Sequence, residues 1–63
     1  MQIGEKYMHY KNNKIYEIVG FPAFQEEFTG KWIYNEIILY KDIYGMLYIR
    51  SNTDFDKKFI KVK

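Results

Sequence analysis

Short stretches rich in β-branched and aromatic residues, separated by turn-forming residues, run through most of the chain. Such stretches are typical of β-strands. They predict strands over the segments Lys6–Tyr10, Ile15–Phe21, Lys31–Tyr40, Met46–Ser51 and Lys58–Val62. Five short strands with a tight turn before the last one predict an all-β domain, a small five-stranded SH3-like barrel. Residues 1–63 are expected to form this single domain.

The stretch from Pro22 to Gly30 carries a mixed signal. Pro22 ends the second predicted strand, because proline has no N–H to continue the ladder. Phe24 and Phe28 are spaced four residues apart, which suits one short helical turn, but a plain loop also fits. At most one helical turn is expected here. The stretch Asn52–Asp54 predicts a turn before the last strand, with a 3₁₀ turn as an option.

The third and fourth predicted strands can be aligned as a hairpin around a loop at residues 41–45. In this alignment Tyr40 faces Met46 and Glu36 faces Arg50. Because side chains alternate between the two faces of a strand, the alignment separates two sets of residues. One face is aliphatic apart from Asn35, and carries Ile33, Ile37, Leu39, Leu47 and Ile49. The other is largely aromatic, and carries Trp32, Tyr34, Glu36, Ile38, Tyr40, Met46, Tyr48 and Arg50. The aliphatic face is expected to be the core, and the aromatic face a binding site or subunit interface.

Composition narrows the possible chemistry. Thirteen aromatic residues make up 21% of the chain, whereas cysteine is absent, which excludes disulfides, thiolate metal sites and thiol catalysis. His9 and Ser51 are the single histidine and the single serine, and their spacing does not suggest a nucleophile and its base. The pair Asp54 and Asp56 lacks the glycine that a calcium loop needs. We therefore expect no enzyme activity, no metal and no cofactor.

Size and charge bear on possible partners. A domain of this length without disulfides or metal has a small core, so a homo-oligomer is expected. The net charge of +2 is low for nucleic acid, although four lysines gather near the C-terminus. Neither a signal peptide nor a long apolar run is visible, so we expect no membrane partner and a cytoplasmic location.

The aromatic face is the best candidate for a ligand site. Tyr48 and Arg50 are two residues apart on one strand and project to the same side. Aromatic rings can stack on a base, and a guanidinium can pair with a phosphate. The predicted ligand-binding residues are Trp32, Tyr34, Tyr48, Arg50, His9 and Lys11. Alternatively, Arg50 pairs with Glu36 across the hairpin, and the aromatic rings pack a dimer.

Four motifs follow each other along the chain. They are Gly4-x-x-Tyr7-x-His9-Tyr10-Lys11, Tyr16-x-x-Val19-Gly20, Tyr40-x-x-x-Tyr44-Gly45 and Leu47-Tyr48-Ile49-Arg50. In their order and gaps the chain resembles a small bacterial and phage family, domain of unknown function 1653, from Gly4 to Val62. It departs from that pattern at residues 23–27, at Tyr48, where the family has Trp, and at Ser51, where it has Pro. The resemblance implies a compact β fold and no established activity.

These observations lead to three functional hypotheses. The first is a non-catalytic module that captures a nucleotide-like small molecule, by analogy with small phage proteins that act as sponges for nucleotide immune signals. The second is a protein-interaction or inhibitor module that uses the aromatic face. The third is a weak RNA-binding barrel.

Overall fold

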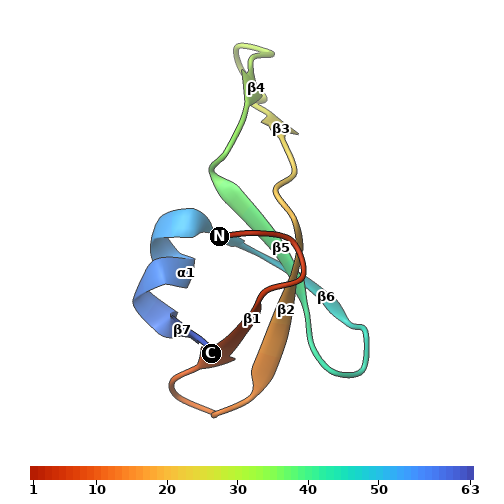
Figure 1. Cartoon of the computed structure of the whole chain (residues 1–63). Coiled ribbons are helices and arrows are strands. Elements are labelled where there is room, and N and C mark those ends of the chain that lie inside the picture. Colours follow the sequence, from red (N-terminus) through yellow and green to blue (C-terminus); the bar gives the residue numbers. More distant parts are fainter.

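The computed structural model describes all 63 residues of the chain (Figure 1). Seven strands and one helix follow each other along the sequence. They are β1 (Lys6–His9), β2 (Ile15–Gly20), β3 (Phe24–Gln25), β4 (Trp32–Ile33), β5 (Ile37–Lys41), β6 (Leu47–Ser51), α1 (Asn52–Lys58) and β7 (Phe59–Lys61). Strands β3 and β4 pair only with each other, and the other five form one sheet.

The main sheet is antiparallel, with the strand order β6-β5-β2-β1-β7. The last strand returns to pair with the first, as expected for the predicted SH3-like fold. No hydrogen-bonded ladder joins β6 to β7, and α1 packs against both of these edge strands instead. The small all-β fold is therefore confirmed, and α1 connects β6 to β7 along the chain (Figure 1).

The hydrophobic core lies between the sheet and α1, on what we call the inner face of the sheet. Its five buried residues are Ile18, Ile38, Tyr40, Phe55 and Phe59, and Tyr7 and Tyr16 pack against them. The rings of Phe55 and Phe59 stack with centroids 4.0 Å apart. Tyr40 meets both rings edge-on at 5.3 Å. Aromatic rings in these arrangements supply most of the packing that holds the sheet to the helix.

The predicted core was on the wrong face of the hairpin. Ile38 and Tyr40, from the aromatic set, are 2% and 3% exposed, whereas Ile49, from the aliphatic set, is 67% exposed. The reason is that α1 and β7 deliver Phe55 and Phe59 to the aromatic side. The hairpin by itself contains no information about which face receives the helix. The aliphatic set therefore lies on the outer face of the sheet.

The register of the β5–β6 hairpin differs from the predicted one by two residues. Tyr40 faces Tyr48 instead of Met46, and Arg50 faces Ile38 instead of Glu36. The loop is tighter than expected because the N–H of Asp42 donates to the carbonyl of Met46 at 3.1 Å, and Gly45 takes a positive φ of 86°. A shift of two residues keeps every side chain on its face, so the predicted separation of the two sets is preserved within β5 and β6.

The predicted long strand Lys31–Tyr40 is broken in the middle. Asn35 adopts a left-handed backbone with φ 62°, so β4 ends at Ile33 and β5 begins at Ile37. Asparagine tolerates this conformation better than most residues. Strand β4 then leaves the main sheet and pairs with β3, forming a two-stranded arm that projects from the body (Figure 1). We call residues 22–35 the arm.

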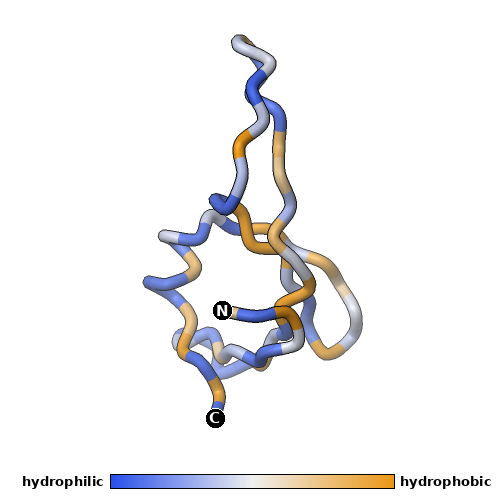
Figure 2. The backbone as a smooth tube through the Cα atoms, turned by 45° about the horizontal axis from the view of Figure 1, so that its top comes forward, coloured by the Kyte–Doolittle hydropathy of each residue, from blue (hydrophilic) through white to orange (hydrophobic).

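The tip of the arm is organised around Glu26. Its carboxylate accepts hydrogen bonds from the N–H groups of Phe28 and Thr29 and from the Thr29 hydroxyl. The arm has no helical turn at Phe24–Phe28; residues 24 and 25 form β3, and a turn follows at residues 27–29. Most residues of the arm are hydrophilic or of intermediate hydropathy, in contrast to the hydrophobic stretches of the main sheet (Figure 2).

The helix lies where a turn was expected. Ser51 caps α1, and its hydroxyl accepts a hydrogen bond from the N–H of Asp54. Asp54 in the first turn and Lys57 and Lys58 in the last turn complement the helix dipole. With seven residues, α1 is too short to cross a membrane.

Replacing Phe55, which is completely buried, is expected to unfold the domain. The variant Phe55→Ala should lose about 3–5 kcal/mol of unfolding free energy, most of what a small domain has. Phe28→Ala is the matched control, because Phe28 is 93% exposed at the tip of the arm. Chemical denaturation followed by circular dichroism measures both, and equal midpoints for the two variants would contradict this account of the core.

Candidate ligand-binding site

The structure brings four of the six predicted ligand-binding residues together and leaves two apart. His9 and Arg50 both contact the ring of Phe59. The ring centroids of His9 and Phe59 are 4.8 Å apart. The guanidinium carbon of Arg50 lies 5.4 Å from the centroid of the Phe59 ring. The N–H of Lys11 donates to His9, and Tyr48 stacks on Tyr40. Trp32 and Tyr34 lie in the arm, away from this group (Figure 1), because the strand breaks at Asn35.

Arg50 is held by two neighbours, one in the core and one on α1. Its Nε donates to the Tyr40 hydroxyl at 3.1 Å, and its Nη1 donates to Asp54 at 2.6 Å. The pairing with Glu36 that we considered is therefore wrong, because the actual register and α1 place Asp54 within reach instead. A guanidinium has five donors, so the Nη2 edge of Arg50 remains free of protein partners. The side chain as a whole is 27% exposed.

Positive charge surrounds His9. Desolvation, followed by the charges of Arg50, Lys11 and Lys58, lowers the pKa of His9 below its ordinary value of 6.5. The hydrogen bond from the N–H of Lys11 to Nδ1 acts in the same direction, because it requires an unprotonated Nδ1. Asp54 is the acidic member of this group, and it already pairs with Arg50 and Lys58. We call His9, Lys11, Arg50 and Lys58 the cationic cluster.

The turn between β1 and β2 connects the cationic cluster to a neighbouring hollow. Asn12 accepts a hydrogen bond from the N–H of Lys14 and donates to the hydroxyl of Tyr16. Asn13 takes a positive φ of 58°, which closes the turn. The ring of Tyr16 in turn contacts Phe59 at 5.5 Å, the same ring that His9 and Arg50 touch. Tyr16 thus lies between the cluster and the hollow.

The hollow has a volume of about 340 Å³, within the usual range of small-molecule sites. It lies between the β1–β2 turn and the β5–β6 loop. Its lining is mainly apolar and aromatic, with three tyrosines, and consists of Asn13, Lys14, Ile15, Tyr16, Asp42, Ile43, Tyr44 and Tyr48. We call it the tyrosine hollow.

Asp42 fixes the side of the tyrosine hollow formed by the β5–β6 loop. Its carboxylate accepts hydrogen bonds from the N–H groups of Tyr44 and Met46 and from the hydroxyl of Tyr48. The last of these bonds raises the pKa of Tyr48 above its ordinary value, because it would bring two negative charges together. All three bonds satisfy Asp42 within its own hairpin, so the loop is ordered before any ligand arrives.

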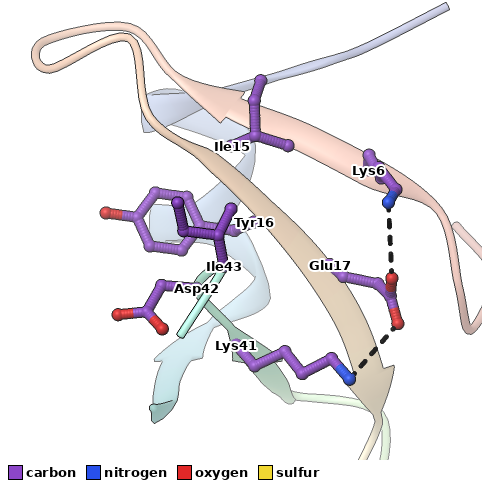
Figure 3. Close-up of a pocket in the computed structure, with 7 residues that line it drawn as sticks. All are labelled: Lys6, Ile15, Tyr16, Glu17, Lys41, Asp42 and Ile43. Carbon is purple, nitrogen blue, oxygen red and sulfur yellow. Dashed lines mark ion pairs between the residues drawn. The ribbon is translucent and has the colours of Figure 1, made fainter. Parts of the chain in front are cut away.

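A second hollow of about 300 Å³ adjoins the first on the outer face (Figure 3). Glu17 lies between Lys6 and Lys41 there, with each nitrogen 3.7 Å from one of its oxygens. Both lysines are thereby partly neutralised. The second hollow is therefore a weaker candidate for a charged ligand than the tyrosine hollow.

Several residues of the site were missing from the prediction, namely Lys14, Tyr16, Tyr44 and Phe59. Tyr16 faces Tyr7 across the β1–β2 ladder, so pairing those two strands in the sequence would have placed it beside the inner-face residues. Phe59 could not be found in this way, because its position depends on β7 returning to β1.

A third hollow, of about 520 Å³, lies on the outer face where the arm begins. It is apolar, and its lining consists of Pro22, Ala23, Phe24, Ile37, Leu39 and Ile49. Three of its residues, Ile37, Leu39 and Ile49, belong to the aliphatic set that the prediction assigned to the core. It contains no charged side chain, so it does not suit an anionic ligand.

Comparison of the chain with protein-family models, with curated proteins and with solved structures found no match. The resemblance to the domain of unknown function 1653 family therefore stays a prediction. The structure places His9, Tyr48 and Arg50 of its motifs on the inner face of the sheet.

The lowered pKa of His9 predicts that acid weakens the fold. Above pH 6.5 the histidine is neutral in both the folded and the unfolded state, so its full contribution to the stability of the fold is present. As the pH falls below 6.5, the unfolded chain binds a proton before the folded chain does, and stability decreases. Thermal melting between pH 7.5 and pH 5.5 should show this loss. His9→Phe keeps a ring against Phe59 but cannot titrate, so its melting temperature should fall less; an equal fall would contradict the assignment.

Proposed function

We propose that this chain is a non-catalytic binding module that captures a nucleotide-like small molecule. The planar ring of the ligand occupies the tyrosine hollow, and its anionic group meets the cationic cluster. The observation that carries the proposal is the free Nη2 edge of Arg50 beside His9, at one side of a set of exposed tyrosine rings. We propose that the protein acts in the cytoplasm as a sponge of the kind that phages use against nucleotide immune signals.

The charges around the inner face support an anionic ligand. Arg50, Lys11 and Lys58 carry three positive charges against the single negative charge of Asp54, with His9 neutral. Arg50 is fixed in place by Tyr40 and Asp54, so little side-chain entropy is lost when a phosphate binds it. A bound anion would also favour protonation of His9, which gives a second charge-assisted contact below neutral pH.

The single serine and the single histidine make structural contacts. The hydroxyl of Ser51 caps α1 through the N–H of Asp54, and Nδ1 of His9 accepts the N–H of Lys11. These contacts support capture of a ligand without turnover.

The other two hypotheses receive less support. The protein-interaction hypothesis used the aromatic face, and two residues of that face, Ile38 and Tyr40, are buried in the core, which leaves less of it for a partner. For RNA binding, the net charge of +2 is low for a phosphate backbone, and among the four C-terminal lysines Lys61 is paired with Glu5 at 2.6 Å.

A matched pair of tyrosines tests the position of the ring site. Tyr44 lines the tyrosine hollow and Tyr34 lies in the arm, and both are well exposed, so neither replacement should disturb the core. A thermal-shift screen with mononucleotides and cyclic nucleotides would identify a ligand, and calorimetry would measure its Kd. Tyr44→Ala should weaken binding by about 5–150-fold, the usual value of one stacking contact, and Tyr34→Ala should leave it unchanged. The reverse result would restore the site predicted from sequence.

Arg50→Lys tests the anion site. Lysine keeps the charge but loses the forked donors, so affinity for the same nucleotide should fall by about 10-fold or more, as expected for a charge-assisted hydrogen bond. Glu36→Gln is the control, because Glu36 does not contact Arg50, and it should bind like the unmodified chain. Unchanged affinity in Arg50→Lys, with the fold intact by circular dichroism, would rule out Arg50 as the anchor. Binding of single-stranded RNA that weakens steeply with salt, without nucleotide binding, would favour the third hypothesis.

A further inference from the structure

Strand β6 is an open edge of the main sheet. It pairs with β5 on one side and with no strand on the other. Its sequence, Leu47-Tyr48-Ile49-Arg50-Ser51, contains no proline or lysine, and its register with β5 has no bulge. Proteins usually protect such edges with these devices, because an unprotected edge invites another strand to pair with it. The opposite edge, β7, is shorter and carries Lys61.

The hydrogen-bond alternation shows which backbone groups of β6 are free. The N–H of Asp42 donates to the carbonyl of Met46, and the N–H of Asn52 donates to the carbonyl of Glu36. These two bonds bracket the β5–β6 ladder, and hydrogen-bonded pairs alternate along an antiparallel pair. Tyr48 and Arg50 therefore point their backbone groups at β5. Leu47 and Ile49 point theirs away from the sheet.

The exposed side chains beside this edge are apolar. Ile49 is 67% exposed and Leu47 is 56% exposed; both lie on the outer face, and Ile49 lines the third hollow. Apolar side chains and unpaired backbone groups thus occur on the same strand. In the single chain, both the free backbone groups and these apolar side chains face solvent.

The molecule also exposes more surface than its mass requires. Its accessible area is 4928 Å², against about 4,400 Å² for a compact monomer of 7.8 kDa. Part of the excess belongs to the projecting arm. A standard interface buries about 800 Å² on each partner, and pairing through β6 would cover the exposed Leu47 and Ile49 as part of that area.

We propose that β6 pairs with β6 of a second copy of this chain, antiparallel and centred on Ile49. In this register Ile49 faces Ile49 of the other copy, and the free N–H and carbonyl groups of Leu47 and Ile49 become paired. The two sheets join into one, and the aliphatic outer faces of the two copies become continuous. Tyr48 lies opposite Arg50 of the other copy, so each ligand-binding site gains a neighbour across the two-fold axis. The pairing does not depend on a ligand.

Light scattering at micromolar concentrations should give twice the chain mass of 7.8 kDa. Ile49→Pro removes an N–H that β5 does not use, so the monomer fold should survive and the dimer should dissociate. Ile49→Lys should also dissociate it, because two like charges would face each other on the axis. Ile60→Lys is the matched control on the far edge strand, at 57% exposure, and should stay dimeric. A monomeric unmodified chain, or a dimer that survives Ile49→Pro, would overturn the proposal.

Amide hydrogen exchange tests the register directly. In the dimer the N–H groups of Leu47 and Ile49 should be protected, and dilution below the Kd should expose them. The N–H groups of Tyr48 and Arg50 should remain protected at both concentrations, since β5 holds them. A dimer in which Leu47 and Ile49 exchange at unprotected rates would instead be packed through the outer faces and would contradict edge pairing.

Discussion

The stacking of Phe55 on Phe59 is the contact on which the rest of the structure depends. Their ring planes are nearly parallel, and Tyr7 and Tyr40 pack edge-on against Phe55. Because Phe55 comes from α1 and Phe59 from β7, this stack decides which face of the sheet becomes the core. The aliphatic side chains of β5 and β6 are then left on the outer face. With five buried residues, the domain has few other contacts that could replace it.

The proposed ligand site is built on the rim of this same core. Phe59 contacts Tyr16, His9 and Arg50, and Tyr40 holds the guanidinium. Side chains that line the site therefore also stabilise the fold, so binding and stability are coupled. A ligand that tightens these contacts should raise the melting temperature of the protein, since it binds the folded state alone. Acid, which disfavours the neutral His9, acts in the opposite direction on the free protein.

The parts of the site that sequence reasoning missed share one physical cause. The alternation of side chains between two faces predicts their positions only while the strand continues. Asn35 ends the strand with a left-handed backbone. Trp32 and Tyr34 were therefore placed beside Tyr48, although they belong to the arm. The helix had a local signal, since Ser51 followed three residues later by Asp54 is a typical helix start. The short segment between two strands was instead interpreted as a turn.

The sequence by itself determined the strand-rich composition, the approximate bounds of four of the five main strands and the separation of aromatic from aliphatic side chains in the β5–β6 hairpin. These features depend on alternation and on turn residues, which are local. Only the tertiary structure decided which face is buried and that His9, Tyr16 and Arg50 meet at Phe59. The physical reason is that these contacts join β1, β2, β6 and β7, and the return of β7 to β1 brings together residues far apart in the chain.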